Sequence, residues 1–311
     1  MASLLWLQTV ACSGDSMSLL NAEHPNLIEA LDLYGVELLW HPSLALTSVH
    51  GLGKLIAEIQ SGKRPLDLLA IEGAIAFGPD GTGMFDPLLG RAKKDLVADL
   101  ARMASYVVAI GTCAAFGGVA AAEPNPTDSC GMQWLRGKPG GLLPSDWRSQ
   151  GGLPVVNIPG CPSHPNAMLQ TLIALLLGAD LKLDELNRPA DFFGRMVHSG
   201  CTRNEFHEYD IEEHAFGGPG CLFFNLGCQG PNTQGPCNTV MWNGESSKTR
   251  RGVPCMGCTG PDFPKNQNLF MTDVIGKIPV TLPLGVRRSN YMAYKGLARA
   301  AAPKRLLPVV K

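Results

Sequence analysis

Residues 88–110, LLGRAKKDLVADLARMASYVVAI, decide the fold because they join an amphipathic helix to a continuous apolar strand. Apolar residues recur at helical spacing over 88–105, and the run at 106–110 carries no charge. A strand that is apolar on both faces is typical of a parallel sheet with helices on each side.

The same alternation runs through the first 180 residues. Strand-like runs occupy 3–8, 36–41, 66–73 and 153–160, and helical periodicity occupies 25–35, 51–62 and 164–178. The sequence therefore predicts an α/β fold over residues 1–180, namely a flavodoxin-like doubly wound parallel sheet. Ligands of such sheets bind beyond the carboxyl ends of the strands.

Four residues with useful chemistry follow predicted strands. Cys12 follows the first strand, Glu72 the third, Cys113 the fourth and Cys161 the fifth. We therefore expect these residues, far apart in sequence, to meet at one edge of the sheet. Asp15 stands three positions after Cys12, where a second cysteine would complete a Cys-x2-Cys pair.

The composition of the chain argues against several classes of protein. The chain has 311 residues, of which 45% are hydrophobic, and its 26 basic and 27 acidic residues give a net charge of -1. This balance favours neither nucleic acid nor an anionic membrane as partner. Ten cysteines are too dilute for a disulfide-stapled secreted domain. The first residues lack a positively charged leader, and no apolar run reaches the roughly 20 residues of a membrane span, so we expect a soluble, cytoplasmic protein.

Beyond residue 181 the periodicity fades. Residues 181–280 are rich in Gly, Pro, Asn and Cys and show one helical stretch, at 202–216. A segment this irregular needs something other than an ordinary core to order it, and metal clusters would do so. Residues 281–311 form a basic tail that is either mobile or docked on a partner.

Seven potential metal ligands lie in this second half, and they are too many for one metal. They divide into a four-ligand set and a three-ligand set: His198, Cys201, Cys221 and Cys228, then Cys237, Cys255 and Cys258. Zinc is an alternative for the first set, because Cys3His is a common structural zinc site. Three cysteines suit a 3Fe-4S cluster better than zinc, which takes four protein ligands.

Six motifs, in order, carry a resemblance to a known family. They are CSGD at 12–15, GTCAAFGG at 111–118, PGCPSHP at 159–165, HSGCTRNEFH at 198–207, GCLFFNLGCQGP at 220–231 and PCMGCTGPDFP at 254–264. Together they resemble the small, electron-transferring subunit of nickel-iron hydrogenases, in its cytoplasmic uptake-type branch. The resemblance covers about residues 4–265.

The resemblance implies three iron-sulfur clusters. It assigns Cys12, Cys113 and Cys161, with Asp15 in the fourth place, to a proximal set. Cys237, Cys255 and Cys258 become a medial set for a 3Fe-4S cluster. The distal set comprises His198, Cys201, Cys221 and Cys228, and it would hold a 4Fe-4S or 3Fe-4S cluster. Cys130 has no counterpart, and we interpret it as a small buried residue.

Two positions depart from the family pattern. Asp15 either ligates iron through a carboxylate oxygen or leaves a 3Fe-4S cluster with an open corner; alternatively, it only caps the following helix. Six residues separate Cys221 from Cys228, where five are expected, which leaves the type of the distal cluster open.

Glu72 either carries a proton or fixes the partner's backbone, or it is simply a structural group whose hydrogen bonds are satisfied.

A nickel-iron centre would need a second Cys-x2-Cys pair. The only such pair, Cys255 and Cys258, is already assigned to the medial set, so no catalytic residues are expected in this chain. The resemblance implies electron relay from H2 oxidation on a separate large subunit with a nickel-iron centre. We expect an uptake hydrogenase linked to quinone respiration, as a higher oligomer of heterodimers, cytoplasmic or peripheral at the inner face of the membrane. The alternatives are a regulatory H2 sensor and the cluster-bearing subunit of an NADH-quinone complex, which leaves the ligands after residue 197 unexplained.

Overall fold

The computed structural model describes residues 1–265 and 269–307, which form two compact units. The first unit comprises Met1–Asp191 and Thr259–Pro264, and the second comprises Phe192–Cys258 and the chain from Lys265 onward. The described residues divide after Asp191. The predicted domain boundaries at residues 180 and 280 stay a prediction.

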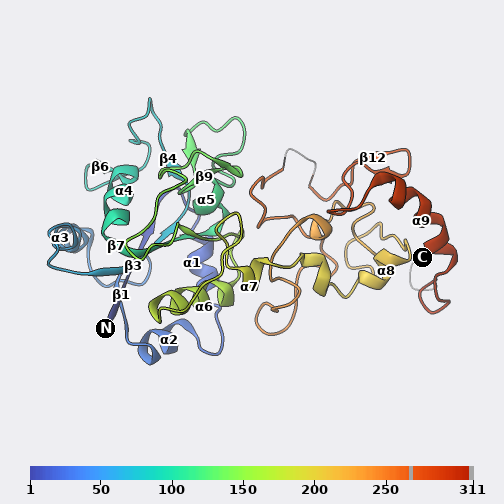
Figure 1. Cartoon of the computed structure of the whole chain (residues 1–311), viewed down its shortest axis with the longest axis horizontal. Helices are drawn as coiled ribbons and strands as arrows, with labels where there is room; N and C mark the ends of the chain where they lie inside the picture. The colour runs from blue at the N-terminus through green and yellow to red at the C-terminus, as the bar shows by residue number, and fades with distance from the viewer. Residues whose placement is uncertain (266–268, 308–311) are drawn as a thin grey trace. The chain divides into compact units, whose positions relative to one another are not determined.

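A five-stranded parallel sheet forms the centre of the first unit (Figure 1). Its strands are β1 (Ala2–Gln8), β2 (Val36–Trp40), β3 (Leu66–Glu72), β7 (Ala104–Ile110) and β11 (Val156–Ile158). The spatial order is β2-β1-β3-β7-β11, and every neighbouring pair is parallel. Numbered along the chain this is the order 2-1-3-4-5 of flavodoxin-like sheets, which confirms the predicted fold class.

Helices cover both faces of this sheet. They are α1 (Gly14–Leu19), α2 (Leu27–Leu33), α3 (Val49–Gln60), α4 (Lys93–Met103), α5 (Gly111–Phe116) and α6 (Pro165–Leu176). On one face, Leu52 of α3 and Leu100 of α4 join Leu69 and Val107 of the strands in one core. On the other face, α6 contacts β3, β7 and α1. Burial on both faces explains why the strands are mostly apolar.

Short antiparallel strand pairs lie in the loops around the sheet. β4 (Ile75–Ala76) pairs with β8 (Ser129–Cys130), β5 (Pro87–Leu88) with β6 (Arg91–Ala92), and β9 (Trp134–Leu135) with β10 (Lys138–Pro139). Cys130 lies opposite Ile75 and is buried in the core of the first unit. Burial raises the pKa of its thiol to about 12, as expected for a small apolar residue.

The second unit contains little regular structure. Its elements are the 3-10 helices Val197–Gly200 and Gly230–Asn232, α8 (Asn204–Glu208), β12 (Val274–Ile275), β13 (Ile278–Pro279) and α9 (Arg288–Ala300), and α7 (Ala190–Phe193) leads into it. The helix predicted over 202–216 is therefore too long. It ends at Glu208 because Asp210 adopts a left-handed conformation, with φ of 55°, and Glu212 then bridges to Cys221.

The basic tail contains a helix that packs on its own unit. In α9, the Lys295 ammonium lies 3.4 Å from carboxylate oxygens of both Asp210 and Glu212, and 5.3 Å from the centre of the Phe224 ring. Helix α9 is thus docked on this chain through Lys295, whereas residues 308–311 lie outside the described residues. Within 1–265 and 269–307, no helix has the length and apolar character needed to cross a bilayer.

Candidate metal centres

The proximal set lies at the carboxyl edge of the sheet. Cys12 follows β1, Cys113 lies in the first turn of α5 directly after β7, and Cys161 follows β11. Burial raises the pKa of the Cys113 thiol, and the nearby charges of Asp15 and Cys12 raise it further. The structure therefore places Cys12 and Asp15 close enough to Cys113 for their charges to act on its thiol.

Two glycines keep space beside the proximal thiols. A Cβ atom at Gly118 would lie 2.7 Å from the Cys113 sulfur, and one at Gly14 would lie 3.1 Å from the Cys12 sulfur. Gly118 also has a positive φ of 51°. A side chain at Gly118 would press on the thiol that a cluster needs, so glycine fits this position for both backbone and steric reasons.

Asp15 is buried and does not cap α1. The helix has Ser13 at its N-cap, whereas Asp15 Oδ1 accepts a 2.7 Å hydrogen bond from the backbone amide of Ser163. Burial raises the pKa of the Asp15 carboxyl to about 7, the Glu72 charge raises it too, and the Ser163 hydrogen bonds lower it. Its Oδ2 atom would touch any Cβ placed on Gly111. Asp15 thus contacts the loops that carry Cys113 and Cys161.

Sequence reasoning missed Ser163, which joins three segments around the proximal set. Besides its amide bond to Asp15, its Oγ accepts from the Gly111 amide at 3.1 Å, and its carbonyl accepts from Ser18 Oγ at 2.6 Å. The only signal available was its place inside the PGCPSHP motif. Ser163 fixes the loop after β11 against α1 and α5.

Glu72 is buried and holds the first turn of α1, which carries Asp15. Its carboxylate accepts hydrogen bonds from the Asp15 and Ser16 amides at 3.1 Å and from Ser16 Oγ at 2.5 Å. Trp6 Nε1 and Gln8 Nε2 also donate to it at 2.9 Å. Only 1% of Glu72 is exposed. Five donors hold one carboxylate, which fixes the backbone after Cys12.

Replacing Glu72 with Gln is expected to destabilise the protein by about 1–3 kcal/mol, because an amide nitrogen would face donors instead of accepting from them. Thermal unfolding of the purified complex measures the effect as a lower midpoint. Glu58→Gln, on the exposed face of α3, is the matched control and should leave the midpoint unchanged. An unchanged midpoint for Glu72→Gln would show that the loop does not depend on this anchor.

The distal set lines a single hollow in the second unit. His198, Cys201, Cys221 and Cys228 all border it. Leu222 and Phe223, between the last two cysteines, are buried with them in a small apolar cluster. The four residues that the sequence groups together therefore do meet around one space.

Hydrogen bonds point at the sulfur atoms of this set. Backbone amides of Arg203, Phe223 and Cys255 lie 3.4, 3.5 and 3.4 Å from the sulfurs of Cys201, Cys221 and Cys228, respectively. His207 Nδ1 lies 3.4 Å from the Cys221 sulfur, and its ring stacks on Phe224. Hydrogen bonds to sulfur are one means of setting cluster potentials. The sequence did not single out His207 as part of the site.

The medial set is also close together. The charges of Cys228, Cys258 and Cys237 raise the pKa of the Cys255 thiol in addition to its burial. The pKa of Cys237 rises to about 11, first through burial and then through the charge of Cys258. Cys255 thus stands beside both the medial and the distal sets.

The donor chemistry fits iron-sulfur clusters. Burial raises the pKa of the Cys228 and Cys237 thiols to about 11 and keeps them protonated in the metal-free chain, so metal binding must release their protons. Among the described residues, no three His, Cys, Asp or Glu converge on one metal ion. In a cluster each thiolate binds a different iron atom, so its ligands stand farther apart than those of a single ion.

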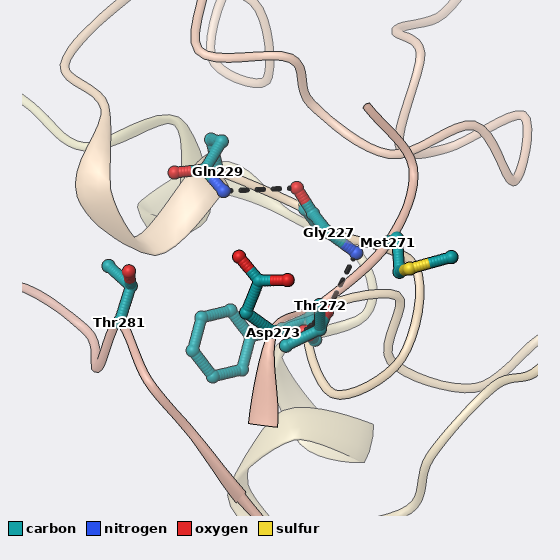
Figure 2. Close-up of a pocket in the computed structure, with 8 residues that line it drawn as sticks. Gly227, Gln229, Met271, Thr272, Asp273 and Thr281 are labelled. Carbon is teal, nitrogen blue, oxygen red and sulfur yellow. Dashed lines mark hydrogen bonds between the residues drawn. The ribbon is translucent and has the colours of Figure 1, made fainter. Parts of the chain in front are cut away.

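A second, polar pocket borders the distal set (Figure 2). Cys228 and Phe223 form part of its wall, together with Gly227, Gln229, Met271, Thr272, Asp273 and Thr281. Figure 2 shows the Asp273 carboxylate pointing into it, and the Gly227 amide donates to Thr272 Oγ1 at 2.8 Å. Cys228 therefore lies between two pockets.

Two family models match the chain. The model described as "NADH ubiquinone oxidoreductase, 20 Kd subunit" matches residues 12–175, and the model for the C-terminal part of the NiFe/NiFeSe hydrogenase small subunit matches residues 193–271. The second model covers both ligand sets of the second unit, which the respiratory-complex alternative leaves unexplained. This chain belongs to the family of nickel-iron hydrogenase small subunits and is part of a hydrogenase complex.

Similar proteins and solved structures support this family membership. The chain is 34% identical over 285 residues to the small subunit of F420 non-reducing hydrogenase II from Methanosarcina mazei, which covers 84% of this chain and 73% of that protein. It is 34% identical over 286 residues to the periplasmic [NiFeSe] hydrogenase small subunit of Desulfomicrobium baculatum, with 86% of each chain covered. The actinobacterial-type NiFe-hydrogenase structure from Ralstonia eutropha H16 matches with a TM-score of 0.79 and 30% identity, over 99% of this chain and 91% of that one.

Proposed function

We propose that this chain relays electrons, in an uptake hydrogenase, from H2 oxidation on a separate large subunit to an acceptor of quinone-linked respiration. The observation that carries this proposal is the hollow that gathers His198, Cys201, Cys221 and Cys228. Iron-sulfur clusters, when bound, accept and release single electrons. The residues of the chain hold the clusters, tune them through hydrogen bonds to sulfur and exclude water from them.

Three ligand sets support a relay with three stations. The proximal set takes electrons first, and the medial and distal sets follow. The three cysteines of the medial set suit a 3Fe-4S cluster, and Asp15 in place of a thiolate suits a proximal cluster of comparatively high potential. High-potential stations favour H2 uptake and a quinone acceptor over low-potential acceptors.

The test is H2-dependent dye reduction by the tagged chain, purified anaerobically with its native partners. We expect sustained turnover, a nickel-bearing large subunit in the preparation and a mass above that of one heterodimer. Negligible turnover with an intact nickel-bearing partner would favour a regulatory H2 sensor. Electron paramagnetic resonance of the oxidised complex should detect 3Fe-4S centres, and zinc alone would refute the relay.

The location of the complex stays a prediction. We propose a cytoplasmic location, with peripheral attachment at the inner face of the membrane. The names of two relatives, both periplasmic hydrogenases, favour the opposite location. Cell fractionation with marker enzymes for each compartment decides between them.

A further inference from the structure

A buried cation lines the hollow of the distal set. Arg203, two residues after Cys201, is 8% exposed and borders this hollow. Its Nε donates to the Thr249 carbonyl at 2.6 Å, and its Nη1 donates to the Gly218 and Gly220 carbonyls at 2.5 Å. All three acceptors are neutral, so they satisfy the donors without balancing the charge.

No carboxylate among the described residues compensates Arg203 directly. Within the part of the chain that the structure describes, no salt bridge joins Arg203 to an acidic residue. Burial raises the pKa of the Glu213 carboxyl, but hydrogen bonds from the amides of Gly220, His214 and Ala215 lower it, and the charge of Arg203 lowers it further. A buried charge without a partner is strongly unfavourable. Glu213 acts on Arg203 without forming a salt bridge, so further negative charge in the hollow would stabilise the buried cation.

The hollow itself is where that negative charge belongs. Cys201, Cys221 and Cys228 border it beside Arg203, and they become thiolates when they bind metal. Nη2 of Arg203 makes no hydrogen bond within the described part of the chain. Three thiolates around one hollow would supply negative charge in addition to that of Glu213.

We propose that Arg203 is the counter-charge of the distal cluster and stabilises its reduced state. This inference rests on the proposed function. Reduction brings one electron from the medial set and changes no bond, so the distal site becomes more negative by one charge. A fixed cation at the wall stabilises the reduced state more than the oxidised state. Arg203 thereby raises the potential of the last station and draws electrons toward the acceptor.

The experiment compares Arg203→Gln and Arg203→Lys in the purified complex, by a redox titration followed by electron paramagnetic resonance. Gln keeps amide donors for the carbonyls of Gly218 and Gly220 but carries no charge, whereas Lys keeps the charge. We expect Arg203→Gln to make reduction of the distal cluster at least tenfold less favourable, a potential about 59 mV lower for one electron. Arg203→Lys should stay near the unaltered potential. The proximal signal is the internal control and should not move in either variant.

Two results would overturn the proposal. If Arg203→Gln leaves the distal potential unchanged, Arg203 only fixes the loop at 218–220. If Gln and Lys both abolish the distal signal, the guanidinium is needed to build the site and not to balance its charge. Missing cluster signals in the unaltered complex would instead refute the proposed function, and with it the basis of this inference.

Discussion

Cys255→Ser is expected to lower H2-dependent dye reduction by at least about 100-fold, since even the partners of metal ligands often contribute 10–100-fold. Cys255 is the cysteine that stands beside two ligand sets. The charges of Cys228, Cys237 and Cys258 all act on its thiol, and its own amide donates to the Cys228 sulfur. Losing its sulfur should empty the medial site and disturb the distal one.

The readouts are the dye-reduction rate, the iron content and the 3Fe-4S signal of the purified complex. Cys130→Ala is the matched control, because Cys130 lies in the apolar core of the first unit and in none of the three ligand sets. This control should keep the full iron content and rate. A Cys255→Ser complex with an undiminished rate and 3Fe-4S signal would remove Cys255 from the relay.

The sequence predicted the sheet because the sheet is built from local patterns. Apolar strands such as Ala104–Ile110, alternating with amphipathic helices, suffice to specify a doubly wound fold and to place cysteines after the strands. Helix α9 was missed because its apolar residues share the segment with Arg and Lys, and its docking depends on Asp210 and Glu212, far away in sequence.

The spacing of the predicted ligands indicated iron-sulfur chemistry, but it did not indicate the residues that contact those ligands. Ser163 meets Asp15 across 148 positions, and Arg203 meets Thr249 across 46. Both contacts use backbone groups, which carry no sequence pattern of their own. Glu72 stood out from its position at a strand end, but three of its five donors, on Asp15 and Ser16, depend on how the segment after β1 folds back.

Asp15→Cys is expected to change both the spectrum and the potential of the proximal cluster. A thiolate is a softer and more covalent donor to iron than a carboxylate, so the new Cys-x2-Cys pair with Cys12 should stabilise the oxidised state. We expect reduction to become at least about tenfold less favourable, or about 59 mV lower in potential. A redox titration of the complex followed by electron paramagnetic resonance measures both quantities.

Asp15→Asn separates ligation from the contact with Ser163, because the amide oxygen still accepts from the Ser163 amide but carries no negative charge. If Asp15 binds iron, Asn should alter the proximal spectrum as well, since a neutral amide is a poorer iron ligand than a carboxylate. If Asp15 serves only to hold the loops of Cys113 and Cys161, Asn should preserve the spectrum. An unchanged spectrum and potential in both variants would assign the proximal cluster to its three cysteines alone, with the buried carboxylate acting as a clamp between two loops.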